Sequence, residues 1–414
     1  ERLRKLFSWD VIVDEYAKEL KFNLDGLNKK IKVLHLIDTL WLGGAQTLVK
    51  GIVENRQPSD EYHLFALRKT QPSVKVDHKN VRIYNSGSRY NPLPLFALAK
   101  LIKQEKIGVV HCHLPRSHVF GYILKRFFVP EVKLVIHEHG DIYEKGKLLS
   151  ALLGKFQVKV NLFIACSSGL KRCLIQKSGI EETKIKVIHN YVNDVIFQPE
   201  KVCWNVSEEK EKLGFNRDDF VVGFAGRLVH RKGWREFLNA AAKIKSGLSA
   251  PLKIKFLIAG TGPEEIILKR QIGDMNLENM VKFIGYVENM VWFYSLLDCC
   301  VIPSHWEGMP LVQLEAMAMG VPLVTTDGIG MDEVETPNGS APLTTRLDAS
   351  APAFGGTNRL IVNVGDSEGF VQKIKWLILN TKLRKTLIVE GVRRAREMGV
   401  QGYNEKLNEI YRNL

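Results

Sequence analysis

Two glutamates, Glu307 and Glu315, stand eight positions apart in the segment PSHWEGMPLVQLEAMAMGVP, which spans residues 303–322. Pro310 favours the first turn of a helix, so we expect Glu307 in the preceding loop and Glu315 inside the helix. A carboxylate can accept hydrogen bonds from two hydroxyls of a sugar or a ribose. Because the apolar residues 316–319 follow Glu315, we expect a buried carboxylate with a binding role rather than a solvated charge.

The same segment offers backbone donors. Gly308, Met309 and Leu311 lie where the helix is expected to begin, and the first N–H groups of a helix have no acceptor within it. These groups can therefore bind a phosphate or sugar oxygen, which the positive end of the helix dipole also favours.

A second candidate group is basic. The sequence GRLVHRKG at 226–233 follows an apolar strand-like run. Arg227 and Lys232 in this loop could hold a diphosphate, and Gly226 would leave room for it. The alternative is an ordinary basic loop in solvent.

Paired glycines occur at two further strand ends. Gly43 and Gly44 follow the first strand and open a helix, and Gly260 and Gly262 follow a strand of the second half. Glycine lets the backbone approach a ligand closely. The alternative reading is that both pairs only make tight turns.

Histidines form the last candidate group. The runs HCH and HEH place His111, His113, His137 and His139 at the ends of two expected strands, where we expect them to face the space between two domains. No metal site is predicted, because alternation along strands does not build a tetrahedron from these four. None of the six cysteines forms a C-x-x-C pair and no D-x-D sequence is present; we expect reduced, mostly buried thiols.

The elements that would position these groups alternate between apolar, β-branched runs and amphipathic stretches. Strands are predicted at 31–38, 61–67, 81–84, 109–112, 133–137, 162–165 and 186–188, then at 220–225, 253–259, 281–284, 299–302, 322–325 and 360–364. Helices fit between them, for example at 45–54, 93–105 and 117–127. Such a pattern predicts buried parallel sheets, and two series indicate two doubly wound α/β domains joined near 190–205.

Composition sets further bounds. The chain has 414 residues, of which 45% are hydrophobic and 25% charged, which excludes a disordered or fibrous chain. No run approaches the roughly 18 apolar residues of a membrane-spanning helix, and we expect a cytoplasmic protein.

The formal net charge is +14, and residues 30–200 hold 26 basic against 14 acidic side chains, net +12. This asymmetry predicts an anionic partner, such as a membrane surface, or simply solubility.

In order along the chain, the G-G-A, G-R-L-x-x-x-K-G, G-x-G-P and E-G-x-P-L-x-x-x-E-A-M-A-x-G-x-P motifs resemble the retaining glycosyltransferases of family 4. The resemblance covers about residues 32–414. It implies the GT-B fold, in which two Rossmann-like domains face each other across a cleft, and a nucleotide-diphosphate sugar as donor.

The resemblance also implies roles for matching residues. Gly43 and Gly44 would lie under the donor diphosphate, which Arg227 and Lys232 would neutralise. Glu307 would contact the hydroxyls of the donor sugar, and Glu315 the ribose. His113 and His139 match positions where the family often has a histidine near the sugar. Asn190 resembles the family's N-G-V-D hinge turn, although Tyr191 and Asn193 replace the usual Gly and Asp.

The domain assignment follows from both lines of reasoning. We expect residues 1–30 to form an extra helical segment, 31–195 an acceptor-binding domain, 196–400 a donor-binding domain with a flexible insertion at 335–357, and 401–414 a closing helix.

The predicted function is metal-independent, retaining transfer of a hexose to a sugar or lipid-linked acceptor, with no cofactor and no nucleic acid, either in the cytoplasm or on the inner face of a membrane. The alternatives are a GT-B epimerase or phosphorylase-type enzyme, and a nucleotide-sugar binding module without turnover.

Overall fold

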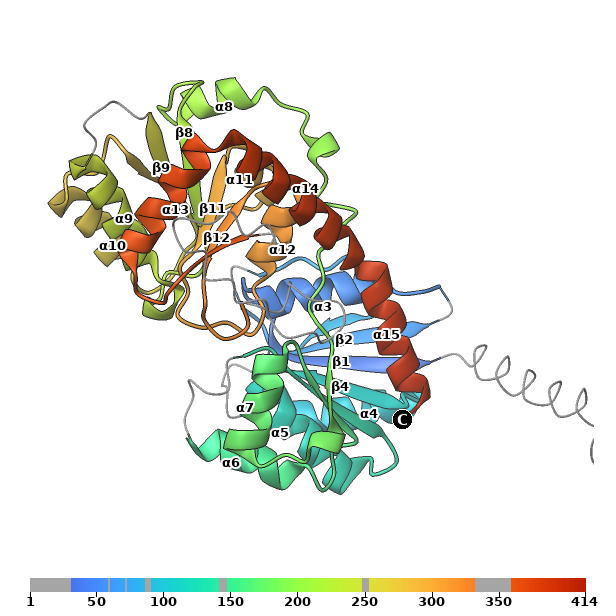
Figure 1. Cartoon of the computed structure of the whole chain (residues 1–414). Helices are drawn as coiled ribbons and strands as arrows, with labels where there is room; N and C mark the ends of the chain where they lie inside the picture. The colour runs from blue at the N-terminus through green and yellow to red at the C-terminus, as the bar shows by residue number, and fades with distance from the viewer. Residues whose placement is uncertain are drawn as a thin grey trace, which may run out of the picture.

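The computed structural model describes residues 31–58, 60–70, 73–85, 91–140, 147–247, 253–331 and 359–414. The predicted N-terminal segment 1–30 and the predicted insertion 335–357 lie outside the described residues. Two α/β domains, each built on a parallel sheet, account for the rest (Figure 1).

The first domain contains a seven-stranded sheet with the order β3-β2-β1-β4-β5-β6-β7. The inner strands are buried on both faces, as expected for a parallel sheet covered by helices, whereas the edge strands β3 and β7 have exposed residues. The strands are β1 (Lys32–Thr39), β2 (Glu61–Arg68), β3 (Val81–Ile83), β4 (Val109–His113), β5 (Lys133–Glu138), β6 (Leu162–Ala165) and β7 (Ile185–Val187). The helices are α3 (Gly44–Glu54), α4 (Pro94–Glu105), α5 (Pro115–Ile123), α6 (Lys147–Phe156) and α7 (Ser168–Ser178).

The second domain contains a six-stranded sheet with the order β10-β9-β8-β11-β12-β13. Its strands are β8 (Phe220–Ala225), β9 (Ile254–Ala259), β10 (Val281–Phe283), β11 (Cys299–Ile302), β12 (Leu323–Thr326) and β13 (Arg359–Val362). Its helices are α8 (Val206–Lys212), α9 (Trp234–Ser246), α10 (Glu265–Asp274), α11 (Met290–Ser295), α12 (Leu311–Ala318), α13 (Ser367–Leu379) and α14 (Thr381–Glu397). The fold class predicted from the sequence is confirmed.

The last helix, α15 (Val400–Arg412), returns to the first domain, over which it lies in Figure 1. Asn408 is fully buried there: its amide donates to Asp60 at 2.6 Å, and it accepts from the Tyr62 hydroxyl at 2.6 Å. The helix thereby covers one face of the first sheet, together with α3.

The chain crosses between the domains at two adjacent places. Val192, in the linker after β7, donates from its N–H to the carbonyl of Met398 at 2.9 Å. The N–H of Val400 donates to the Asp194 carboxylate at 3.2 Å. The linker and the approach to α15 are therefore bonded to each other.

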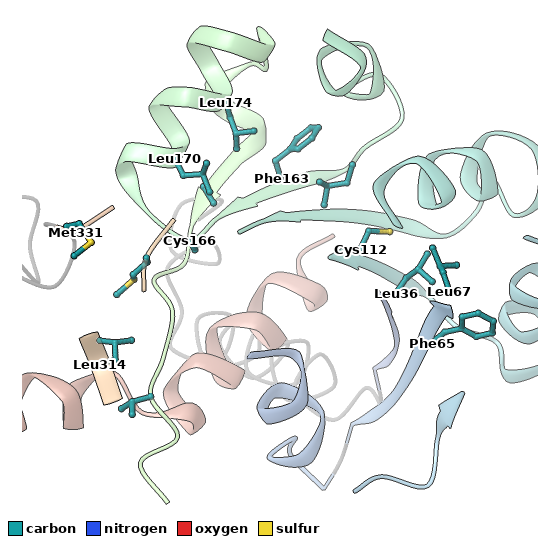
Figure 2. Close-up of a cluster of buried hydrophobic side chains, with 14 of the residues drawn as sticks. Leu36, Phe65, Leu67, Cys112, Phe163, Cys166, Leu170, Leu174, Leu314 and Met331 are labelled. Carbon is teal, nitrogen blue, oxygen red and sulfur yellow. The ribbon is translucent and has the colours of Figure 1, made fainter. Parts of the chain in front are cut away.

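One buried hydrophobic cluster runs from one domain into the other. Figure 2 labels Leu314 of α12 and Met331 with Cys166 and Leu170 of the first domain. All four are at most 3% exposed, so the two domains share packed surface in this structure. Among the described residues, no helix combines the length and apolar composition that a bilayer crossing needs.

Candidate active site

Glu307 lies in the loop before α12 and is the centre of an ionic cluster. Its carboxylate accepts from the Lys232 ammonium and, at 2.7 Å, from the Ser304 hydroxyl. The Arg231 guanidinium lies 3.6 Å from its other oxygen. Burial alone would raise the pKa of Glu307, but Lys232 and Arg231 with their hydrogen bonds hold that pKa below its ordinary value. The first glutamate is therefore a charged, buried carboxylate whose nearest cation is Lys232.

Glu315 lies on α12 and is 9% exposed. The hydroxyl of Tyr294, at the end of α11, donates to it at 2.8 Å. Burial raises the pKa of Glu315 to about 7, although the Tyr294 hydrogen bond acts in the opposite direction. Glu315 also lines a pocket between α3, the linker and α12, so the predicted burial of this carboxylate is correct.

Arg227 is exposed at the end of β8, and its guanidinium lies over the ring of Trp41, 4.9 Å from the centroid. Trp41 comes from the first domain, just before α3. A cation over an indole face is stabilised by the ring quadrupole. This contact spans the two domains and places Arg227 on the same side of the second domain as the start of α3.

The paired glycines have two different explanations. A Cβ on Gly44 would come within 3.8 Å of the Leu311 side chain, so the start of α3 faces the start of α12. Gly260 has a φ of +134°, and a Cβ there would overlap the carbonyl of Gly226. A Cβ on Gly262 would meet the backbone of Leu228 at 2.4–2.8 Å and therefore needs the same absence of a side chain. Packing of two strand-end loops thus explains the second pair without a ligand.

The loop before α12 packs closely against the first domain. A Cβ on Gly308 would clash with the carbonyl of His139 and lie 2.9 Å from the Cys166 sulfur. The Asn190 amide donates to the carbonyl of Met309 at 2.7 Å. This bond ties the hinge turn directly to the loop, so the position of the donor motif depends on the linker.

The histidines form a layer on one face of the first sheet. His35, opposite His111 in the register of β1 and β4, joins His111, His113 and His137, and all four are fully buried. The expectation that His111 and His113 face the space between the domains is wrong, because α15 covers this face of the sheet and its Tyr411 hydroxyl lies 2.6 Å from His111 Nδ1. His139, just beyond β5, keeps partial exposure.

His113 uses both ring nitrogens within this layer. Its Nε2 lies 3.1 Å from His35 Nδ1, and its Nδ1 lies 3.1 Å from His139 Nε2. The expected role of His113 in touching a substrate does not fit this burial, whereas His139 can still do so. Two groups of three histidines place their nitrogens within 4.8 Å of one another, and the absence of a bound metal ion stays a prediction.

Sequence reasoning missed Tyr294, Arg231 and Trp41 as members of the site. Arg231 belonged to a quoted basic loop, and Trp41 preceded a quoted glycine pair, so local position was a usable signal for both. Tyr294 is 21 residues from its partner in sequence, and nothing local points to it.

Two family models match this chain. One, described as Glycosyltransferase Family 4, matches residues 42–195. The other, described as Glycosyl transferases group 1, matches residues 205–394. The first match begins after β1 and contains the other six strands of the first sheet, and the second match contains the whole second sheet.

Relatives of this chain are glycosyltransferases as well. An Escherichia coli UDP-Gal:alpha-D-GlcNAc-diphosphoundecaprenol alpha-1,3-galactosyltransferase is 33% identical over 242 residues, which are 56% of this chain but only 61% of that protein. A capsular polysaccharide biosynthesis glycosyltransferase, CapM of Staphylococcus aureus, is 27% identical over 77% of this chain and 80% of its own length.

Solved structures show the fold. Anabaena HepE, solved with UDP and glucose, has a TM-score of 0.77 at 20% identity, and the match covers 93% of this chain and all of that one. The sucrose-phosphate synthase of Thermosynechococcus elongatus has a TM-score of 0.73 at 17% identity, over 93% of this chain and 99% of that one. With two facing parallel-sheet domains and a family match on each, this chain belongs to the family 4 glycosyltransferases of the GT-B fold.

Proposed function

We propose that the enzyme transfers a hexose from a nucleotide-diphosphate sugar to an acceptor hydroxyl with retention of configuration and without a metal ion. The product would be part of a polysaccharide, lipopolysaccharide or glycolipid. The observation that carries the proposal is the cluster of Lys232, Arg231 and Glu307 directly before α12, with Arg227 in the same basic loop.

The chemistry explains why these groups suit the reaction. Loss of a nucleoside diphosphate from the sugar leaves negative charge on the leaving phosphate, and preorganised positive groups stabilise it. Lys232, Arg227 and the N-terminus of α12 supply such groups. When the donor binds, the Lys232 ammonium would either leave the Glu307 carboxylate for the phosphate or bind both groups at once. Retention rests on the family resemblance.

Glu307 and Glu315 would divide the recognition of the donor. Glu307, ionised and beside the cations, would accept from hydroxyls of the sugar. Glu315, in the pocket between α3 and α12, would accept from the ribose. Two similar proteins support a donor of this class, since HepE was solved with UDP-glucose and the E. coli relative is named for UDP-Gal.

Turnover of UDP-, GDP- and ADP-hexoses with and without EDTA tests the proposal. We expect one donor to stabilise the protein, by about 2.7 kcal/mol at a hundred times its Kd, and to be consumed equally in EDTA. Lys232→Ala should lower kcat, whereas the control Lys243→Ala, which removes only a surface pair with Glu368, should not. Loss of turnover in EDTA refutes metal independence, and equal activity of Lys232→Ala refutes the diphosphate role.

The same assay separates the alternatives. Hydrolysis or epimerisation of the donor without any acceptor product identifies an epimerase or phosphorylase-type enzyme. Donor binding without turnover identifies a silent binding module.

The acceptor domain carries a surface that suits an anionic membrane. On α4, Phe96 is 61% exposed, and Lys100 and Lys103 lie on the same exposed side. Phe127, 68% exposed, lies beneath the Arg126 guanidinium in the π-helical turn Leu124–Phe128, which packs against α4. Exposed aromatic rings among cations are typical of surfaces that enter the headgroup region of a membrane.

Sedimentation with vesicles tests this surface. We expect binding to vesicles that contain phosphatidylglycerol and little binding to pure phosphatidylcholine. Phe96→Ser should weaken binding, and Ile266→Ser, at a more exposed apolar position on α10 of the other domain, should not. Equal binding of both variants would contradict a role for α4.

A further inference from the structure

Three histidines form a continuous hydrogen-bonded chain that ends where the two domains meet. His35 Nδ1 lies 3.1 Å from His113 Nε2, and His113 Nδ1 lies 3.1 Å from His139 Nε2. His35 and His113 are fully buried, and His139 has the only exposed surface of the three. The carbonyl of His139 faces Gly308 of the loop before α12, so this end of the chain belongs to the active-site region.

Burial favours the neutral form of all three rings. Burial lowers the pKa of His35 to about 3, and the nearby His78 contributes in the same direction. Burial lowers the pKa of His139 to about 3, with a smaller contribution from His118. The pKa of His113 is lowered in the same direction by burial and the surrounding histidines. Each ring therefore carries one N–H.

One N–H for each ring leaves two possible arrangements. If His113 accepted at both nitrogens it would be an anion, and if it donated at both it would be a cation, which its burial excludes. Either every ring donates towards His139, or every ring donates towards His35. The choice fixes which nitrogen of His139 carries the proton.

His35, at the buried end of this row of histidines, decides between the two directions of donation. His35 Nε2 is buried and has no partner among the described residues. If the rings donate towards His35, His35 Nε2 carries an N–H without an acceptor. If they donate towards His139, His35 Nε2 carries only an unused lone pair. Orphaned buried N–H groups are the rarer case in folded proteins. The hydrogen bonds are therefore donated outward, from His35 to His113 and from His113 to His139.

We propose that His113, supported by His35, is a positioning residue that holds His139 as its Nδ1–H tautomer, so that His139 offers a hydrogen-bond donor to a substrate oxygen. The substrate part of this statement rests on the proposed function; the tautomer does not. His139 then binds a hydroxyl or phosphate oxygen through its N–H and does not act as a general base.

A metal ion is the competing explanation for such a cluster. His35, His111 and His113, and likewise His113, His137 and His139, have nitrogens close enough to bind one ion. Neither group contains a carboxylate or thiolate, so a divalent ion in this buried layer would need a bound hydroxide or another anion to balance its charge. The hydrogen-bonded chain accounts for the two 3.1 Å separations without such a cost.

Nitrogen NMR of protein with ¹⁵N-labelled histidine reads the tautomers directly. We expect His139 in the full chain to be protonated at Nδ1. His113→Phe keeps a ring in the layer but removes the donor, so the His139 tautomer should become mixed. His113→Asn places an amide N–H at the position of Nδ1 and should restore it. His111→Phe is the matched control, since His111 lies on the same strand and face but outside the chain.

Donor turnover is measured on the same four proteins. We expect kcat to fall about tenfold in His113→Phe and to stay within a few fold of the wild type in His113→Asn and His111→Phe. A His139 protonated at Nε2, an unchanged tautomer in His113→Phe, or a stoichiometric metal in the purified protein would overturn the assignment. Equal kcat in His113→Phe and His111→Phe would overturn the link to the substrate. If the wild type turns over no donor at all, the proposed function fails, and the NMR result still decides the tautomer.

Discussion

Replacing Glu315 with glutamine should make the protein more stable at neutral pH. Burial raises the pKa of Glu315 to about 7 from an ordinary value of 4.5. Between these two values the unfolded chain releases the proton and the folded chain keeps it, so stability falls as pH rises. At 1.36 kcal/mol for each unit of pKa, the full cost above pH 7 is about 3 kcal/mol.

The effect is best measured as the change, between two pH values, in the difference in unfolding free energy between Glu315→Gln and the wild type. Integrating the linkage relation from pH 5 to pH 8 predicts that Glu315→Gln gains about 2–3 kcal/mol relative to the wild type over that interval. The amide adds an N–H₂ group that needs an acceptor, but this cost does not depend on pH and cancels. Tyr294 can still donate to the glutamine oxygen, so the local packing is retained.

Urea unfolding of the full chain at pH 5 and pH 8 measures this effect. The control is Leu314→Ala, which removes a fully buried neighbour on the same helix without changing a titratable group, and its cost of about 2–5 kcal/mol should be equal at both pH values. If the difference in unfolding free energy between Glu315→Gln and the wild type is the same at pH 5 and pH 8, a raised pKa of Glu315 is refuted.

The variant should also bind the donor less tightly if Glu315 contacts the ribose, which calorimetry at pH 8 would show.

Three further outcomes are expected. Gly308→Ala forces a methyl group against the carbonyl of His139, so the domains must shift apart; kcat should fall while each domain stays folded by circular dichroism, and unchanged kcat would contradict the packing. Asn408→Ala removes two buried hydrogen bonds, one to Asp60 and one from Tyr62, and should lower the free energy of unfolding by about 2–4 kcal/mol, measured in urea; a loss below about 0.5 kcal/mol would rule out its anchoring role. Asn190→Ala removes one buried hydrogen bond between linker and loop and should cost about 1 kcal/mol, and an unaltered melting curve would argue against it.

Much of the fold could be predicted from local sequence. The runs at 220–225 and 299–302 match β8 and β11 exactly as the structure bounds them, because a strand buried on both faces must be continuously apolar. The expected helix at 117–127 begins two residues earlier, at Pro115, and changes to a π-helical turn at Leu124. Nothing in the apolar pattern distinguishes a π turn from an α turn.

The site was predicted where its residues are neighbours in sequence. Glu307, Gly308 and Glu315 lie around one helix start, and a single motif locates them. The surroundings of the histidines could not be predicted, because they depend on where α15 packs, some 300 residues along the chain from His111. The partner of Glu315 likewise depends on the placement of α11. The catalytic and binding roles of these residues remain predictions.

The return of α15 to the first domain means that the chain cannot be divided cleanly in two. A cut in the linker near residue 195 would release no independent half, because residues 400–412 of the C-terminal fragment would still complete the N-terminal fold. An N-terminal fragment expressed alone would leave Tyr62 and the histidine layer open to water. Two separately produced fragments should therefore reassociate, and the last helix would guide them together.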